Sequence, residues 1–446
     1  MPHDAASEPE PKRVPGLSLL ADVRVGETLP VLALTANVFI LLCAYYLLKV
    51  AREPLILASG SANVKSYAAA GQALVLVVVS QLYGALAGRL DRIRLVTSVT
   101  LFFVSNLVLF AVLAQAGASI GVPFFLWVGI FNLMVIAQFW SFAADLYSSE
   151  DGKRLFPIVG LGSSVGAIAG STWAKSLVGL GPATLMATGA VLLVVSLLLT
   201  RFVHKSSLLR RAKSAADAAE NGQAPPPETQ ELGGPSGAKL IVTDRFLVGV
   251  AVLMLLINVV NTTGENLFDR ALLAAAPQDT AARVVFIGAK KAEFFTYVNG
   301  AAVLLQMFVV SRVLKHLGLT IALTLVPLVS LFGYGSLAIT PILSVIFVAK
   351  VAENSLDYSL QNTARQTLWL VTSRAAKYKA KAIIDTFIVR GGDVVAAGVV
   401  AFGAQQALTT PGLARVNVVM VCLWLAVAIF VAREYAKRAA ANAEKA

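Results

Sequence analysis

Charged and amide side chains interrupt several long apolar runs of this 446-residue chain. Lys49 and Arg52 end the first run, Lys65 opens the second, and Asn261 and Glu265 lie in a run of the second half. An ionisable group inside a bilayer is costly unless it is paired or hydrated, so such groups are functional candidates. Lysine binds phosphate as a point charge and arginine as a bidentate donor. The excess of cations predicts an anionic ligand.

A second set of charges lies near the end of the chain. Lys350 and Glu353 are three residues apart on one expected helix, which permits an internal salt bridge. Arg390 can form a similar pair with Asp393 or Asp385. Both groups therefore have a structural interpretation beside a ligand-binding one.

The alternatives differ from site to site. Lys49 and Arg52 can extend from a helix end to the membrane interface, and this is as plausible as ligand contact. For Glu265 and Arg365 we favour function, and we expect both to face a central cavity between two halves of the chain. Glu265 or Glu353 could instead carry a proton.

The composition of the chain predicts that these residues belong to a membrane protein. Apolar residues make up 57% of the chain and charged residues 14%, and the mean hydropathy is +0.75. Apolar runs of this length would leave large exposed patches on a soluble protein. The chain is therefore expected to be an all-α polytopic membrane protein, and its +12 net charge is expected to reflect basic cytoplasmic loops.

Twelve apolar segments are long enough to cross a bilayer. They lie near 28–50, 66–88, 95–116, 124–147, 156–178, 182–203, 246–268, 293–311, 319–339, 342–365, 383–405 and 412–432. The expected organisation is an N-terminal tail (1–27), a six-helix half (28–203), a flexible linker (204–243), a second six-helix half (244–432) and a C-terminal tail (433–446). Two six-helix halves joined by a long basic loop are typical of the major facilitator architecture.

The distribution of basic residues predicts the orientation. Of the 37 Lys and Arg residues, 25 fall on the side of the N-terminus, 9 on the other side and 3 within spans. Basic loops stay in the cytoplasm, so both termini and the linker are predicted to be cytoplasmic.

Other function classes lack their signatures. The three histidines lie outside the expected spans, and neither a Ser-His-Asp arrangement nor a phosphate-binding loop of Walker type occurs in the sequence. We expect no catalytic residues, no metal, no cofactor and no nucleic-acid partner. The expected partners are the lipid bilayer and a nucleotide or other anionic small molecule, and the expected assembly is a monomer.

The charged motifs resemble those of the bacterial and plastid ATP/ADP translocase family. The segment 45–53, Tyr-Tyr-Leu-Leu-Lys-Val-Ala-Arg-Glu, is similar to the family's first-span pattern, and Lys65 and Glu265 match two of its charged residues. The segment 153–162 resembles its Lys-Arg-Phe/Tyr-Pro and Gly-x-Gly loop. The segment 377–385, followed by Arg390, is similar to its Lys-x-Lys-Gly-Lys-Ala-x-Ile-Asp motif.

The resemblance implies nucleotide exchange by alternating access in a bacterial inner membrane. The chain departs from the family pattern in the tenth span. There Asp357 replaces the family's lysine before tyrosine, and Arg365-Gln366 replaces Lys-Glu. A related phosphorylated anion is therefore an open alternative, as is a proton-coupled facilitator of another small solute.

Overall fold

The computed structural model describes residues 28–59, 61–87, 90–146, 149–221, 236–373 and 376–443. Within these ranges the chain is helical, and no described residue belongs to a β-strand. The predicted N-terminal tail, 1–27, lies outside the described residues. The expected all-α class is confirmed.

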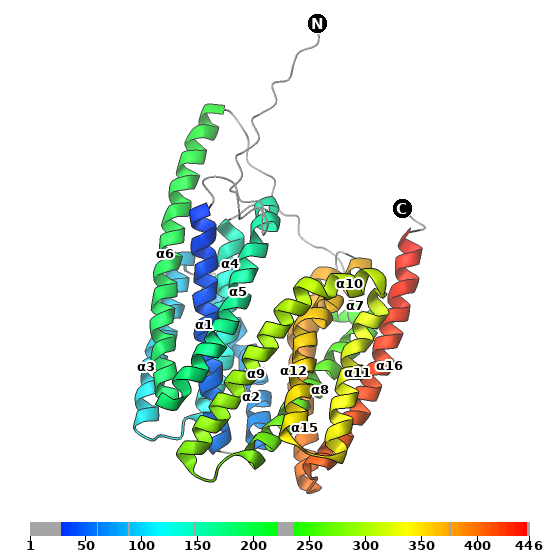
Figure 1. Ribbon diagram of the computed structural model, residues 1–446. Helices are drawn as coiled ribbons and strands as arrows, with labels where there is room; N and C mark the ends of the chain where they lie inside the picture. Colours follow the sequence, from blue (N-terminus) through cyan, green and yellow to red (C-terminus); the bar gives the residue numbers. More distant parts are fainter. Residues whose placement is uncertain are drawn as a thin grey trace.

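The first six helices pack around α1. Their bounds are α1 (Thr28–Ser59), α2 (Ala62–Ala87), α3 (Arg92–Gln115), α4 (Gly121–Leu146), α5 (Ser149–Leu177) and α6 (Pro182–Asn221). In Figure 1, α1 and α3 to α6 lie together on the left. Helix α1 contacts α4, α5 and α6, and its apolar side chains form much of the core of this group.

Helix α5 packs closely on α1 through glycines at four-residue spacing, Gly162, Gly166 and Gly170. A Cβ at Gly166 would collide with the backbone of Phe39. Spacing of four residues places small residues on one helix face, which lets two backbones approach. This interface is therefore tightly packed, and we call it the glycine interface.

The remaining helices lie on the right of Figure 1, except that α9 begins at the lower left, beneath the first group. Their bounds are α7 (Gly237–Thr243), α8 (Arg245–Ala275), α9 (Thr280–Phe308), α10 (Val310–His316), α11 (Gly318–Ile339), α12 (Leu343–Leu356), α13 (Asn362–Thr367), α14 (Lys381–Ile383), α15 (Val389–Gln405) and α16 (Thr410–Ala443). π-Helical turns join α12 to α13 (Asp357–Gln361), precede α14 (Ala376–Ala380) and join α14 to α15 (Ile384–Ile388). The expected basic loop at 377–381 is thus helical.

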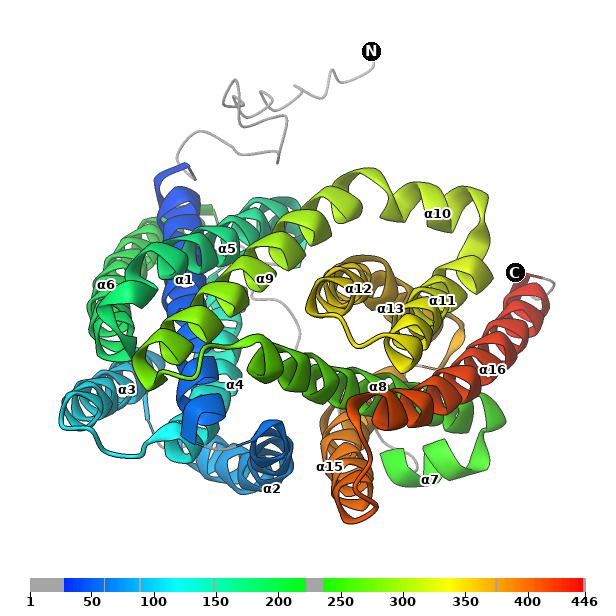
Figure 2. The same ribbon diagram turned by 60° about the horizontal axis from the view of Figure 1, so that its bottom comes forward.

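Two helices, α9 and α2, connect the groups. Helix α9 runs obliquely across Figure 2 and packs on α5 and α1, and α2 packs on α15 and α8. The start of α1, the end of α6, α7, α10 and the end of α16 lie at one end of the molecule, at the top of Figure 1. We call this the terminal end, and the other the distal end.

Nine helices of the described chain are long and apolar enough to cross a membrane, or ten if α9 and α10, bent by 44° to each other, form one span. Large apolar side chains such as Phe332 and Ile339 are mostly exposed on the outside. Such a surface is suited to lipid.

Several helices extend beyond the predicted spans. The expected flexible linker, 204–243, is helical at both ends: α6 continues to Asn221, and α7 occupies Gly237–Thr243. The expected C-terminal tail continues α16 to Ala443. Helix α8 ends at Ala275, beyond the span predicted at 246–268, and α9 begins at Thr280, before the span predicted at 293–311. Charged residues in these extensions, Asp269 and Lys291, are buried in the protein interior.

Candidate functional site

A polar cavity of about 280 Å³ lies between the two groups of helices. Its lining comes from α1, α2, α8, α9, α12, α15 and the π-helical turn that follows α12. The charged residues of the lining are Lys49, Arg52, Lys65, Arg390, Glu53, Glu265, Asp269 and Asp393. We call it the charged cavity. Helix α8 contributes a polar stripe to it at helical spacing: Asn258, Asn261, Thr262, Glu265, Asn266 and Asp269.

Glu53 of α1 accepts several cations and is only 1% exposed. Arg52 donates to its Oε1 from Nε and Nη2, at 3.1 and 2.7 Å. Lys65 of α2 donates to Oε2 at 2.5 Å. Removing a buried carboxylate from water is expensive without such partners. Glu53 therefore holds the ends of α1 and α2 together.

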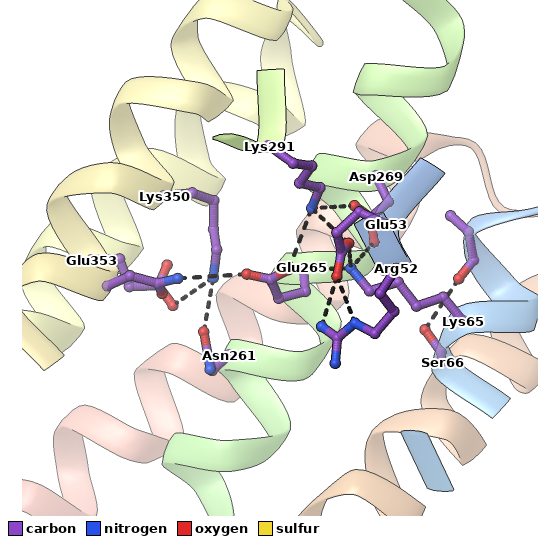
Figure 3. Close-up of polar contacts among 12 residues, drawn as sticks. Arg52, Glu53, Lys65, Ser66, Asn261, Glu265, Asp269, Lys291, Lys350 and Glu353 are labelled. Atoms are coloured by element: carbon purple, nitrogen blue, oxygen red, sulfur yellow. Dashed lines mark hydrogen bonds and ion pairs between the residues drawn. The ribbon is translucent and has the colours of Figure 1, made fainter. Parts of the chain in front are cut away.

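Ion pairs also cross from one group of helices to the other (Figure 3). Lys65 Nζ lies 2.8 Å from Asp269 and 3.5 Å from Glu265, both on α8. Lys291 of α9 lies 3.5 Å from Glu53 and 2.6 Å from Asp269. The distal end of the cavity is thus closed by charges from both sides.

Further hydrogen bonds add to this closure. Asn266 donates to Ser66 at 3.0 Å, and Arg270 donates to Asn63 at 3.0 Å, in both cases from α8 to α2. On the outside, Lys175 of α5 lies 3.9 Å from Glu293 of α9. These contacts join α2 to α8 and α5 to α9, and so link the two groups of helices.

Asp269 and Lys291 were missed by the sequence analysis, and Glu53 was not chosen as a site residue. Asp269 follows Glu265 by four residues, so the polar stripe of α8 continues past the predicted end of the span at 268. Lys291 was assigned to an external loop, yet it is fully buried. Helical periodicity extended through these charges is the signal that finds them.

Lys49 differs from the other cations of the cavity. Its Nζ lies 4.2 Å from the ring centre of Phe295 and 5.2 and 5.9 Å from those of Tyr46 and Tyr45. Within the described chain no carboxylate lies within 4 Å of it. Aromatic faces attract a cation without neutralising it. Among the described residues Lys49 therefore has no direct ion-pair partner, although Glu265 and Glu53 lie near enough to act on its charge.

Lys350 and Glu353 lie behind the charged cavity rather than on its lining. The predicted pair is present, with Lys350 Nζ 3.2 Å from Glu353 Oε1. Lys350 also donates to Asn261 at 2.9 Å, and Tyr334 donates to Glu353 at 2.6 Å. Tyr334 reaches that carboxylate across Gly264, where a Cβ would collide with its hydroxyl. The pair supports the cavity wall through Asn261.

Arg390 and Asp393 of α15 complete the opposite wall. Arg390 lies 3.5 Å from Asp393, whose Oδ1 also accepts from Asn258 at 2.9 Å and from Thr262 at 3.0 Å. Asp385, the other candidate partner of Arg390, pairs with Lys381 at 2.7 Å.

Arg365 is not among the residues that line the charged cavity. It lies at the end of α13 and pairs with Asp357 at 3.4 Å. Our expectation that Arg365 and Glu265 face the same cavity is therefore wrong. The π-helical turn between α12 and α13 changes the helical register between residues 357 and 361.

The other predicted site residues fall into two sets. The structure places Lys49, Arg52, Lys65, Asn261, Glu265 and Arg390 on the lining of one cavity, and Lys350 and Glu353 behind it. In the described residues no group of three or more His, Cys, Asp or Glu side chains is arranged to hold a metal ion. The charged cavity, with Lys49 and Arg52 in its lining, can bind an anion.

Solved transporters have the same fold. The nucleoside transporter NupG is 14% identical, with a TM-score of 0.63 over 89% of this chain and 98% of that chain. A bacterial homologue of the iron transporter ferroportin, in an inward-facing state, is 11% identical, with a TM-score of 0.63 over 91% and 99%. These likenesses establish a major-facilitator-like helical fold.

Sequence comparison identifies the family. The ADP,ATP carrier protein 1, chloroplastic, of Arabidopsis thaliana is 22% identical over 339 residues. That match covers 67% of this chain but only 51% of the plant protein, so the chain spans about half the length of its relative. The model of the TLC ATP/ADP transporter family matches residues 125–435, which include α8 and α9 and most of the charged cavity. The chain therefore belongs to the TLC ATP/ADP transporter family.

Proposed function

We propose that this protein is a membrane transporter that exchanges nucleotides of the ATP/ADP type by alternating access. The observation that carries the proposal is the charged cavity between two groups of helices, in which Lys49 has no carboxylate partner in the described chain. A lysine without a direct ion-pair partner in a cavity is available to bind an anion. Family membership supports a nucleotide as that anion.

The phosphate groups would bind between Lys49 and Arg52. Only Nε and Nη2 of Arg52 are bound to Glu53, so the guanidinium retains another donor nitrogen for a phosphate oxygen. Glu265 is the most exposed of the three acids that contact Lys291, with 25% of its side chain accessible. It would orient the ligand or a lysine.

Ion pairs at the distal end suggest how binding is coupled to movement. Phosphate oxygens compete with Glu53 and Asp269 for Arg52 and Lys65, and this weakens the ties between the two groups of helices. An empty cavity keeps those ties. A ligand shifts a conformational equilibrium only by its different affinity for the two states. A transporter that stays closed when empty and opens when occupied would exchange substrates rather than leak them.

We propose twelve membrane crossings in two six-helix halves, with both termini cytoplasmic. The nine or ten apolar spans are supplemented by α5 and by the continuous helical run through α12 and α13. The terminal end carries the basic segments, which supports a cytoplasmic location. A cysteine introduced at Lys213 should resist an impermeant thiol reagent in intact cells. Rapid labelling would show that this segment is outside the cell and would contradict the proposed orientation.

Transport into proteoliposomes tests the function. Vesicles loaded with ADP and containing the full chain should accumulate labelled ATP, whereas empty vesicles should accumulate little. Lys49→Gln should raise the half-saturating concentration of ATP about tenfold or more, and Lys49→Arg should have a smaller effect because the charge remains. If vesicles show no exchange with any loaded nucleotide, the proposed function is wrong.

A further inference from the structure

A second cavity lies beside the charged cavity and has no charged residue in its described lining. It measures about 380 Å³ and is bounded by α1, α5, α9 and residues 358–363. Its hydrogen-bonding side chains include Ser163, Ser164, Asn299, Gln306, Asn362 and Thr363. Tyr358 lines both cavities. We call it the neutral cavity.

Asn299 of α9 lies in the wall of the neutral cavity, and its amide nitrogen is buried. The residue is 7% exposed, and its Oδ1 accepts a hydrogen bond from the Tyr46 hydroxyl at 2.9 Å. Its Nδ2 has no hydrogen-bond partner among the described residues. If the amide were turned by 180°, Nδ2 would donate to the Tyr46 hydroxyl and Oδ1 would be left without a partner, so in either orientation one polar atom of Asn299 is unpaired among the described residues. Buried donors without partners are rare in proteins and often mark a ligand or water site.

One tyrosine side chain connects the two cavities. The Tyr46 ring centre lies 5.2 Å from Nζ of Lys49, and the hydroxyl at its other end is bound to Asn299. Lys49 and the unpaired amide of Asn299 are therefore about one side chain apart. A nucleotide is longer than this, and the two cavities meet at Tyr358.

We infer that the neutral cavity is a second subsite, which holds the uncharged base and sugar of the substrate while the charged cavity holds its phosphates. This inference rests on the proposed function. Asn299 donates to the base or sugar through Nδ2, and Gln306 and Asn362 offer both donors and acceptors. The ring of Tyr358, which is 43% exposed, supplies a face for stacking.

The inference predicts different affinities for a ligand that contains a nucleoside and phosphates and for one that contains phosphates alone. A nucleoside diphosphate fills both cavities, whereas inorganic pyrophosphate fills only the charged one. A polar group that would be left unpaired discriminates strongly against a ligand that lacks its partner. ADP should therefore bind the purified full chain at least tenfold more tightly than pyrophosphate in calorimetric titration.

The Asn299→Ala variant tests the assignment. Its affinity for ADP should fall about three- to tenfold, the usual range for one lost hydrogen bond, and its affinity for pyrophosphate should change less than twofold. Asn354→Ala, which removes an amide of the charged cavity, should weaken both ligands alike. If Asn299→Ala does not fold, Gln306→Ala serves as a second variant and should show a smaller loss, also confined to ADP.

The outcomes separate the inference from the proposed function. Equal binding of ADP and pyrophosphate to the unaltered protein, an Asn299→Ala variant that loses both ligands equally, or unchanged ADP binding in that variant would overturn the neutral subsite alone. If neither ADP nor pyrophosphate binds the unaltered protein, the proposed function fails and the subsite fails with it.

Discussion

Helix α1 makes two interfaces of opposite character. On one side it meets α5 through backbone contact at Gly162, Gly166 and Gly170, without charges. At its distal end it meets α2 and α9 through Glu53, which is bound to Lys65 and Lys291. The first interface is held by close packing and the second by ion pairs.

The difference indicates which interface can open. The contact energy between closely packed backbones falls steeply with distance, so a small separation already loses much of it. Ion pairs can be exchanged for water or for phosphate oxygens. We therefore expect α1 and α5 to move as one body, and the contact of α1 and α2 with α8 and α9 to break and re-form during transport.

The largest effect is expected from Lys291→Met. Lys291 is fully buried and lies within 3.6 Å of Glu53, Glu265 and Asp269. Removing it leaves buried carboxylates under-compensated, and breaking one side of a buried ion pair typically costs about 3–5 kcal/mol. Thermal unfolding of the detergent-solubilised protein should shift down strongly, and exchange in proteoliposomes should be lost.

A matched double variant separates charge from shape. Lys291→Met combined with Asp269→Asn removes one cation and its nearest carboxylate together, so much of the thermal stability should return. Exchange should remain impaired because ties between the two groups are missing. If the double variant is no more stable than the single one, the cluster is not held together by charge.

An intermediate effect is expected from Gly166→Ala at the glycine interface of α1 and α5. The added Cβ would meet the backbone of Phe39, which cannot give way without separating α1 from α5, and overpacking of this kind costs about 1–3 kcal/mol. Gly160→Ala, on the same helix but with no atom within 4 Å of its Cβ, should leave stability unchanged or slightly raised. Equal melting temperatures for the two variants would contradict close packing as the basis of this interface.

The two interfaces also show what the sequence could predict. Apolar run length indicated the all-α class, and six of nine proposed site residues line one cavity. Asp269 and Lys291 were missed because a hydropathy criterion ends a span at its first charges. In a buried cluster those charges compensate each other, so the helix continues. That compensation depends on contacts between distant helices, which no local window contains.

The smallest effect is expected at Arg365, where the resemblance and the geometry disagree. The family pattern places a cation here, whereas the structure pairs it with Asp357 at 3.4 Å, away from the lining of both cavities. Neutralising both partners removes the pair without leaving a buried charge, and such paired replacements are often nearly neutral. Asp357→Asn combined with Arg365→Gln should therefore keep the ATP exchange rate in proteoliposomes within about twofold, while Arg52→Gln should reduce it far more. A loss as large as that of Arg52→Gln would place Arg365 in the transport pathway in a second conformation, with the π-helical turn as the element that moves it.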